Sequence, residues 1–365
     1  MKKNALGIWK ISSRQFRILV ILCFIGTSIL LTPGGLAAES KQDAWIAAIV
    51  GSLIGLLVIL FYNSIGSLFP NMSFIECIEK LLGKWLGKMV SLLFVSFLFI
   101  NSATIVWFVG DFVTTQIMPE TPIQFTNILI VGIVVIGTRL GLETFSRAGE
   151  ILFPWVIGLF IILALFASKD IKIQNVQPMF EYGIKPIIRG ALLYVSYSSL
   201  TLIALMMIFP AYINNLKEAK NSFLIGTLIG GFMIFFVTIL SIWVLGHGIT
   251  ARSTFPTYIL AKKVRLGSFL QRIESVIAIL WFISIFYKIL VYFYGGVIGL
   301  AQILELKDYK SLTLPLGMIT VILSLVVYPN STYANVWTST TWIPYVLTYS
   351  FVLPLFLLIV SIFRK

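Results

Sequence analysis

A lysine lies in the middle of a long apolar segment, where a charge is costly and usually functional. Lys288 falls near the centre of the apolar run at about 273–304, and Ser284 precedes it by one helical turn on the same face. We interpret Lys288 as a coupling or gating residue and Ser284 as part of a binding site. The alternative is a charge that reaches a membrane interface or pairs with a carboxylate.

Small and hydroxyl residues interrupt the first long apolar segment. Gly26, Thr27 and Ser28 follow apolar residues that begin at Ile18, and Pro33 removes a backbone donor one to two turns later. A helix broken at mid-membrane frees amides and carbonyls that must face a cavity or a ligand, as in the substrate sites of many secondary carriers. A kink or close helix packing through small residues is the alternative.

Hydroxyl residues also gather in the sixth apolar run, at about 187–210. Tyr197, Ser198 and Ser199 lie there in otherwise apolar surroundings, and we expect them to set side-chain selectivity. Interruptions at matching positions of the first and sixth spans favour a carrier built from two inverted repeats. The alternative is that the serines bond back to the i−4 carbonyl and only bend the helix.

These groups suit a zwitterionic amino acid. Its carboxylate would lie on the amides of residues 26–28, at the positive end of the second half-helix. Its ammonium would face free carbonyls near Phe24 and Tyr194. We expect no cofactor.

Polar residues of the third span supply a wall and an outer feature. Asn101 and Thr104 share one face at i, i+3, although either is also explained by a hydrogen bond between helices. Asp111 lies towards the outer end of the same span. We interpret Asp111 as a second coupling or gating residue that lines an entry vestibule. The alternative is that it caps the helix or pairs with an outer lysine.

Composition limits the class of protein. Of the 365 residues, 59% are hydrophobic and only 11% are charged, which indicates a polytopic membrane protein. The net charge of +13 sits in short loops between apolar runs, so it fits topology and anionic lipid better than nucleic acid. The single histidine, His247, excludes histidine-based metal clusters, and the scattered carboxylates argue against an intramembrane enzyme.

The apolar runs predict an all-α protein of ten membrane helices. Two five-helix halves would cover about 15–168 and 187–363, in one transmembrane domain, with both termini in the cytoplasm because the inner loops hold more Lys and Arg. We expect residues 73–88 to lie along the inner interface. In the outer loop 247–272, the segment after Pro256 is interpreted as a surface lid. The predicted spans are about 15–37, 44–68, 89–117, 123–137, 150–168, 187–210, 222–246, 273–304, 312–328 and 339–363.

Several short motifs, in this order and at these spacings, resemble the spore germination receptor B-subunit family, the endospore germination permeases of the amino acid–polyamine–organocation superfamily. The resemblance covers nearly the whole chain. The motifs are Ile11-Ser12-Ser13-Arg14-Gln15, Ile25-Gly26-Thr27-Ser28, Gln42-Asp43-Ala44-Trp45, Phe69-Pro70, residues 82–88, Gly141-Leu142-Glu143 with Arg147 and Glu150, Phe255-Pro256-Thr257, Arg272-Ile273-Glu274, Trp281 and Lys288.

The resemblance implies a LeuT-like fold, with two inverted five-helix repeats and with helices one and six broken at mid-membrane. It implies nutrient-germinant sensing in the inner membrane of a dormant spore, together with a larger membrane A-subunit and a lipoprotein C-subunit. In sodium-dependent members of the superfamily, helices one and eight border a coupling-cation site, and the Lys288 ammonium would take the place of that cation. The sixth span departs from the pattern, because many members have a glycine near an acidic residue where this chain has Tyr197 to Leu200.

Other functions stay open at this point. A true amino-acid permease or symporter uses the same fold as a receptor, so composition does not separate the two. An amino-acid-gated path for water or ions differs from a receptor only in what crosses the membrane.

Overall fold

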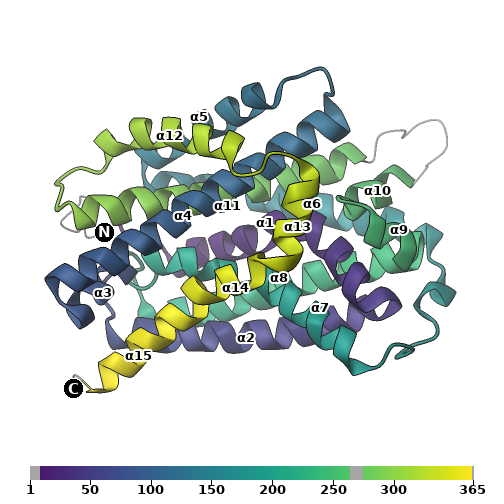
Figure 1. The fold of residues 1–365 in the computed structure, drawn as a ribbon, viewed down its shortest axis with the longest axis horizontal. Coiled ribbons are helices and arrows are strands. Elements are labelled where there is room, and N and C mark those ends of the chain that lie inside the picture. Colours follow the sequence, from purple (N-terminus) through teal and green to yellow (C-terminus); the bar gives the residue numbers. More distant parts are fainter. Residues whose placement is uncertain (1–8, 264–273, 364–365) are drawn as a thin grey trace.

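The computed structural model describes residues 9–263 and 274–363, and nearly all of this chain is helical (Figure 1). The helices are α1 (Ser13–Ser40), α2 (Ala44–Leu68), α3 (Phe74–Leu82), α4 (Lys84–Phe112), α5 (Ile123–Leu140), α6 (Leu142–Ala167), α7 (Ile184–Tyr197), α8 (Leu216–Leu245), α9 (His247–Arg252), α10 (Pro256–Lys263), α11 (Glu274–Ile303), α12 (Lys310–Val326), α13 (Ser331–Thr340), α14 (Trp342–Leu347) and α15 (Leu353–Phe363). The motif residues Arg272 and Ile273 lie outside the described residues.

The protein is an integral membrane protein. By length and apolar character, the described residues contain eight helical stretches able to cross a bilayer, or up to nine if the bent pair α12 and α13 forms one span. The first of these stretches, Ser13–Leu68, contains both α1 and α2. The count of ten membrane helices therefore stays a prediction.

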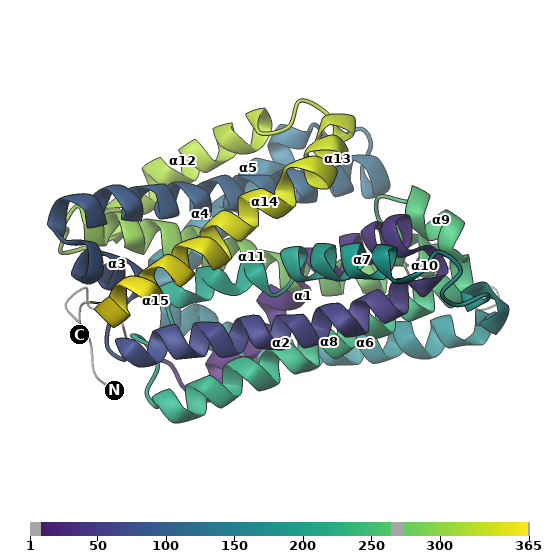
Figure 2. The same cartoon turned by 60° about the horizontal axis from the view of Figure 1, so that its bottom comes forward.

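The bundle has two distinct ends. The start of α1, the end of α15 and helix α3 lie at one end, and α9 and α10 lie at the other (Figures 1 and 2). Helix α13 turns by 94° from α12, and α14 and α15 then run diagonally across the bundle (Figure 2). The bend at α13 was not predicted from the sequence.

Helix α1 is continuous through residues 26–28, so the predicted break in helix one is wrong. The helix is buried along most of its length and contacts α2, α6, α7, α8, α9, α10 and α11. Pro33 lies inside it without an N–H, which leaves the carbonyl of Ile29 without its donor in the helix. The Thr257 hydroxyl of α10 donates to that carbonyl at 2.6 Å, and this bond replaces the missing donor.

The segment after Pro256 is packed into the protein rather than laid on its surface. Helix α10 buries Thr257, Tyr258 and Leu260 and contacts α1, α8 and α11. The prediction of a helix there is confirmed, and the prediction of a surface lid is wrong. The reason is that α1 needs a donor at the Ile29 carbonyl, which a helix lying on the surface could not provide.

The predicted break in the sixth span is present. Helix α7 ends at Tyr197, a turn follows at Ser198 and Ser199, and a 3-10 helix continues over Leu200–Met207. The Ser198 hydroxyl donates to the Tyr194 carbonyl four residues back at 2.7 Å, and the Ser198 amide donates to the same carbonyl at 3.1 Å. The change of helix type leaves the Tyr197 carbonyl open to other donors.

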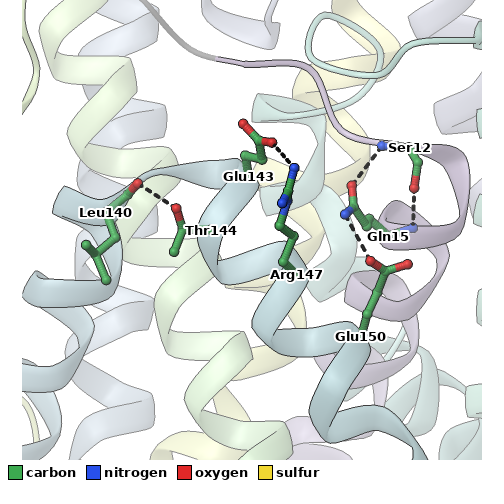
Figure 3. Close-up of polar contacts among 7 residues, drawn as sticks. All are labelled: Ser12, Gln15, Leu140, Glu143, Thr144, Arg147 and Glu150. Carbon is green, nitrogen blue, oxygen red and sulfur yellow. Dashed lines mark hydrogen bonds and ion pairs between the residues drawn. The ribbon is translucent and has the colours of Figure 1, made fainter. Parts of the chain in front are cut away.

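Polar contacts fix α1 against α6 at the end of the bundle where α1 begins (Figure 3). Ser12 and Gln15 form a capping box at the start of α1, and the Gln15 amide also donates to Glu150 at 3.0 Å. Arg14 lies 3.7 Å from the same carboxylate, whereas Arg147 pairs with Glu143 within α6 at 2.6 Å. The motif residues thus join two helices at this end.

The segment predicted at 73–88 is divided at Gly83 into helix α3 and the first turn of α4, and α3 is amphipathic. Ser73 and Glu76 form a capping box at its start, and its apolar residues, including Phe74 and Ile78, are buried. Nearby, Lys88 lies 2.7 Å from Glu305, and this bond lowers the pKa of the Glu305 carboxyl below its usual value.

The bond between α10 and α1 can be tested with Thr257→Val, which keeps the side-chain shape and removes the donor. The Ile29 carbonyl would then be buried without this partner, and we expect the folded state to lose about 1–3 kcal/mol. The measurement is the thermal unfolding midpoint of the detergent-purified protein. Thr257→Ser keeps the hydroxyl and should unfold close to wild type. A midpoint that does not fall in the valine variant would contradict this role.

Candidate functional site

The Tyr197 carbonyl is the meeting point of three segments. The Ser28 hydroxyl of α1 donates to it at 3.1 Å, and the Lys288 ammonium of α11 donates at 3.1 Å. The Thr201 hydroxyl, from the 3-10 helix, reaches the same carbonyl at 3.1 Å and the Ser198 carbonyl at 2.6 Å. The break in helix six is therefore held from α1, from α11 and from its own continuation.

Lys288 is buried, with 1% of its surface exposed, so it does not reach an interface. Its ammonium donates to the Thr27 hydroxyl at 2.7 Å as well as to the Tyr197 carbonyl. One side chain on α11 thus contacts both α1 and the end of α7. The resemblance implied a contact between the first and eighth spans, which are α1 and α11. Lys288 makes this contact and also reaches the sixth span at the end of α7.

A cavity of about 20 Å³ lies beside this lysine. This is room for about one water molecule, so the structure is closed around the site. Nearly all of the exposed lining is apolar. The lining residues are Thr27, Leu31, Asn101, Thr104, Ile105, Phe108, Tyr197, Thr201, Lys288, Tyr292, Tyr328, Thr338 and Trp342.

A larger, open vestibule of about 340 Å³ adjoins the cavity, at the end of the bundle that carries α9 (Figure 2). Its lining includes Glu39 of α1 and Arg252 of α9. Four residues belong to both linings, so they form the layer between vestibule and cavity; they are Leu31, Phe108, Tyr197 and Thr338. A small ligand would reach the cavity from the vestibule once this layer moves.

Five of the predicted site residues line the cavity: Thr27, Asn101, Thr104, Tyr197 and Lys288. They come from α1, α4, α7 and α11. Asn101 also donates to the Phe97 carbonyl at 2.8 Å, within its own helix. The Tyr197 ring stacks on Trp342 of α14 with centroids 5.8 Å apart. The spans named from the sequence as the walls of a site are those that the fold brings together.

Gly26 and Ser284 belong to a helix contact rather than to the cavity. A Cβ at Gly26 would lie 2.9 Å from the Lys288 Cβ and 3.3 Å from the Ser284 carbonyl oxygen. The Ser284 hydroxyl donates to the Trp281 carbonyl at 3.0 Å. Gly26 therefore lets α1 approach α11 closely enough for Lys288 to reach Thr27. Because α1 is continuous there, the amides of residues 26–28 are not free for a carboxylate.

Ser28, Ser198 and Ser199 are all buried, and none lines the cavity. Ser28 and Ser198 donate to backbone carbonyls at the helix break. The Ser199 hydroxyl has no hydrogen-bond partner among the residues that the structure describes. The predicted free carbonyls are also misplaced, because Phe24 lies inside continuous α1 and the Tyr194 carbonyl is bonded to Ser198. The carbonyl that accepts hydrogen bonds from other helices at the break is that of Tyr197.

Asp111 holds the C-terminal end of α4 in place. It is 8% exposed and accepts a hydrogen bond from the Ser331 hydroxyl at the start of α13, at 2.8 Å. It lines neither the cavity nor the vestibule, and it forms no ion pair with a described lysine. The structure thus places it as an anchor of α13.

Five lining residues missed from the sequence follow a named residue by four positions. Four of them lie in the same α-helix and on the same face as that residue, namely Leu31 after Thr27, Ile105 after Asn101, Phe108 after Thr104 and Tyr292 after Lys288. Helical periodicity would have found these four. Thr201 follows Tyr197 beyond the helix break, in the 3-10 helix. The other missed lining residues come from the region of the unpredicted bend, where no residue had been named from which a helical period could be counted. They are Tyr328, Thr338 and Trp342.

Comparison with known proteins gives a consistent family. The family model described as "Spore germination protein" matches residues 10–334. Spore germination protein KB of Bacillus subtilis (strain 168) is 29% identical over 362 residues, which cover 98% of this chain and 95% of that protein. Spore germination protein YndE of the same organism is 25% identical, covering 98% and 97%.

Solved transporter structures share the fold. MhsT in complex with L-phenylalanine superimposes with a TM-score of 0.70 at 14% identity, covering 97% of this chain and 99% of that chain. Mhp1, a nucleobase-cation-symport-1 family transporter in a closed conformation with bromovinylhydantoin bound, gives 0.68 at 12% identity, covering 93% and 76%. At such low identities the likeness concerns the fold, and it confirms the predicted LeuT-like class. The repeat boundaries near 168 and 187 stay a prediction.

The packing role of Gly26 can be tested without any ligand. Gly26→Ala forces the new Cβ against the Lys288 stem, and we expect a loss of about 1–3 kcal/mol from overpacking. The measurement is the thermal unfolding midpoint of ligand-free protein. Gly132→Ala is the matched control, because Gly132 lies on the exposed face of α5 with no neighbouring atom within 4 Å. Equal midpoints for the two variants would show that Gly26 is not a close contact.

Proposed function

The chain belongs to the family of spore germination proteins, and from this premise we propose that it is the germinant-sensing subunit of a receptor, binding a small nutrient in the central cavity. An L-amino acid is the ligand class that we favour, since MhsT has the same fold and was solved with L-phenylalanine. The observation that carries the proposal is the closed cavity at the break in helix six, whose largely apolar lining also includes the Lys288 ammonium, the Asn101 amide and several hydroxyl side chains.

Binding would act through the contacts that close the cavity. A ligand larger than one water needs the lining side chains to move, and Tyr197 and Thr27 are bonded directly to Lys288. Occupancy would therefore shift α1, α7 and α11 relative to one another. We propose that a membrane A-subunit and a lipoprotein C-subunit receive this shift, in the inner membrane of the spore, with both termini of this chain in the cytoplasm. The support for these partners is the family to which the chain belongs.

The test is a variant that fills the cavity. Thr104→Leu adds apolar volume to a lining only large enough for one water, so spores carrying it should need at least tenfold more germinant, and the purified protein should lose its ligand-induced rise in unfolding temperature. Ser199→Ala is the matched control, since its hydroxyl is unpartnered and lies outside the cavity, and it should behave as wild type. A normal response in Thr104→Leu spores would contradict the proposal.

A second candidate function is amino-acid transport, which the vestibule favours. An open space of about 340 Å³ leads to the cavity through a layer of four residues, an arrangement that suits alternating access. The measurement is uptake of a radiolabelled ligand into proteoliposomes. Accumulation would show a permease. A sensor binds the same ligand with no net uptake.

A further inference from the structure

Lys288 has no carboxylate partner. Among the residues that the structure describes, the ion pairs involve Arg14, Lys84, Lys88 and Arg147, all with exposed side chains or exposed partners. Lys288 is instead 1% exposed, and both of its acceptors, the Thr27 hydroxyl and the Tyr197 carbonyl, are neutral. A buried ammonium without a counter-charge is costly, and a protein retains one where a ligand or a mechanism uses it.

The ammonium also has a donor left over. A lysine ammonium carries three N–H groups, and two of them are used by Thr27 and Tyr197. The same side chain lines the cavity. A ligand in the cavity thus meets a positive group that has one donor to spare.

The rest of the lining offers no competing charge. In the described part of the chain, the lining consists of Lys288 together with aliphatic, aromatic, hydroxyl and amide side chains, without an aspartate or a glutamate. The helix-one amides are engaged within continuous α1, so they do not compete for an anion. A carboxylate therefore has one strong partner in this cavity, and a ligand cation has none of opposite charge.

We propose that Lys288 is the carboxylate-binding residue of the site and that the cavity selects small organic carboxylates. This inference rests on the proposed function, since it names the group that recognises the ligand. A charge-assisted hydrogen bond to the spare donor would neutralise the buried ammonium. The carboxylate would then share the nitrogen that holds Thr27 and Tyr197, so its recognition bears directly on the tie between α1, α7 and α11.

The experiment compares acids with their matched carboxamides on the detergent-purified wild-type protein. Each L-amino acid that raises the unfolding temperature is titrated beside its carboxamide, which has the same shape and lacks the negative charge. We expect the carboxamide to bind about ten- to a hundredfold more weakly, the range of one hydrogen bond to a charged group. A simple carboxylate with the same side chain and no ammonium should still compete for the site, because no acidic residue of the lining holds the ammonium.

Variants at Lys288 give the second measurement. Lys288→Met should remove the difference between acid and carboxamide, whereas Lys288→Arg should keep a preference for the acid. If a carboxamide binds wild type as tightly as its acid, the carboxylate inference is overturned while the cavity remains a germinant site. If no compound binds and Thr104→Leu spores respond normally, the proposed function is overturned as well, and this inference falls with it.

Discussion

The backbone carbonyl of Tyr197 is the constraint on which the centre of this protein depends. A helix that stops in the middle of a membrane protein exposes carbonyls that hydrocarbon cannot satisfy. Here α7 stops at Tyr197, and donors from α1 and α11 reach its carbonyl at 3.1 Å each. These two bonds require α1 to pass close to α11, and Gly26 permits that approach. One backbone carbonyl at the helix break is thus a point where three helices meet.

The same rule explains the outer half of α1. Pro33 deprives the Ile29 carbonyl of a donor, and Thr257 of α10 supplies one from a segment more than two hundred residues away in the chain. A proline that would otherwise break the helix thus becomes the point where α10 is attached. In both attachments a hydroxyl or an ammonium of one helix donates a hydrogen bond to a backbone carbonyl of another. A buried carbonyl in an apolar environment needs such a donor, so these bonds position the helices more firmly than apolar packing alone.

This rule also separates what the sequence could predict from what it could not. Interruptions of apolar runs predict where backbone groups become free, which places Tyr197 in the site, and the cost of a charge in an apolar run predicts Lys288. The sequence did not tell which of two interrupted helices breaks, because α1 stays continuous only through partners on α10 and α11 that are distant in the chain. The serines at 198 and 199 were assigned to a ligand, although the first serves the local turn. Tyr328, Thr338 and Trp342 lie at or beyond a 94° bend that the apolar pattern did not predict. A local signal was present in Pro329-Asn330, because the Asn330 side chain caps α13 by accepting from the Tyr333 amide at 2.8 Å.

The cation at the centre of this fold, the Lys288 ammonium, is covalently part of α11. A carrier driven by a metal-ion gradient must bind and release its ion in each cycle, whereas the Lys288 ammonium cannot leave α11. It ties α1, α7 and α11 together through the Thr27 hydroxyl and the Tyr197 carbonyl. A ligand that binds the ammonium meets the same nitrogen that holds these helices, so occupancy acts on the tie directly. A tie that stays within the chain and responds to occupancy suits the sensing role that we propose.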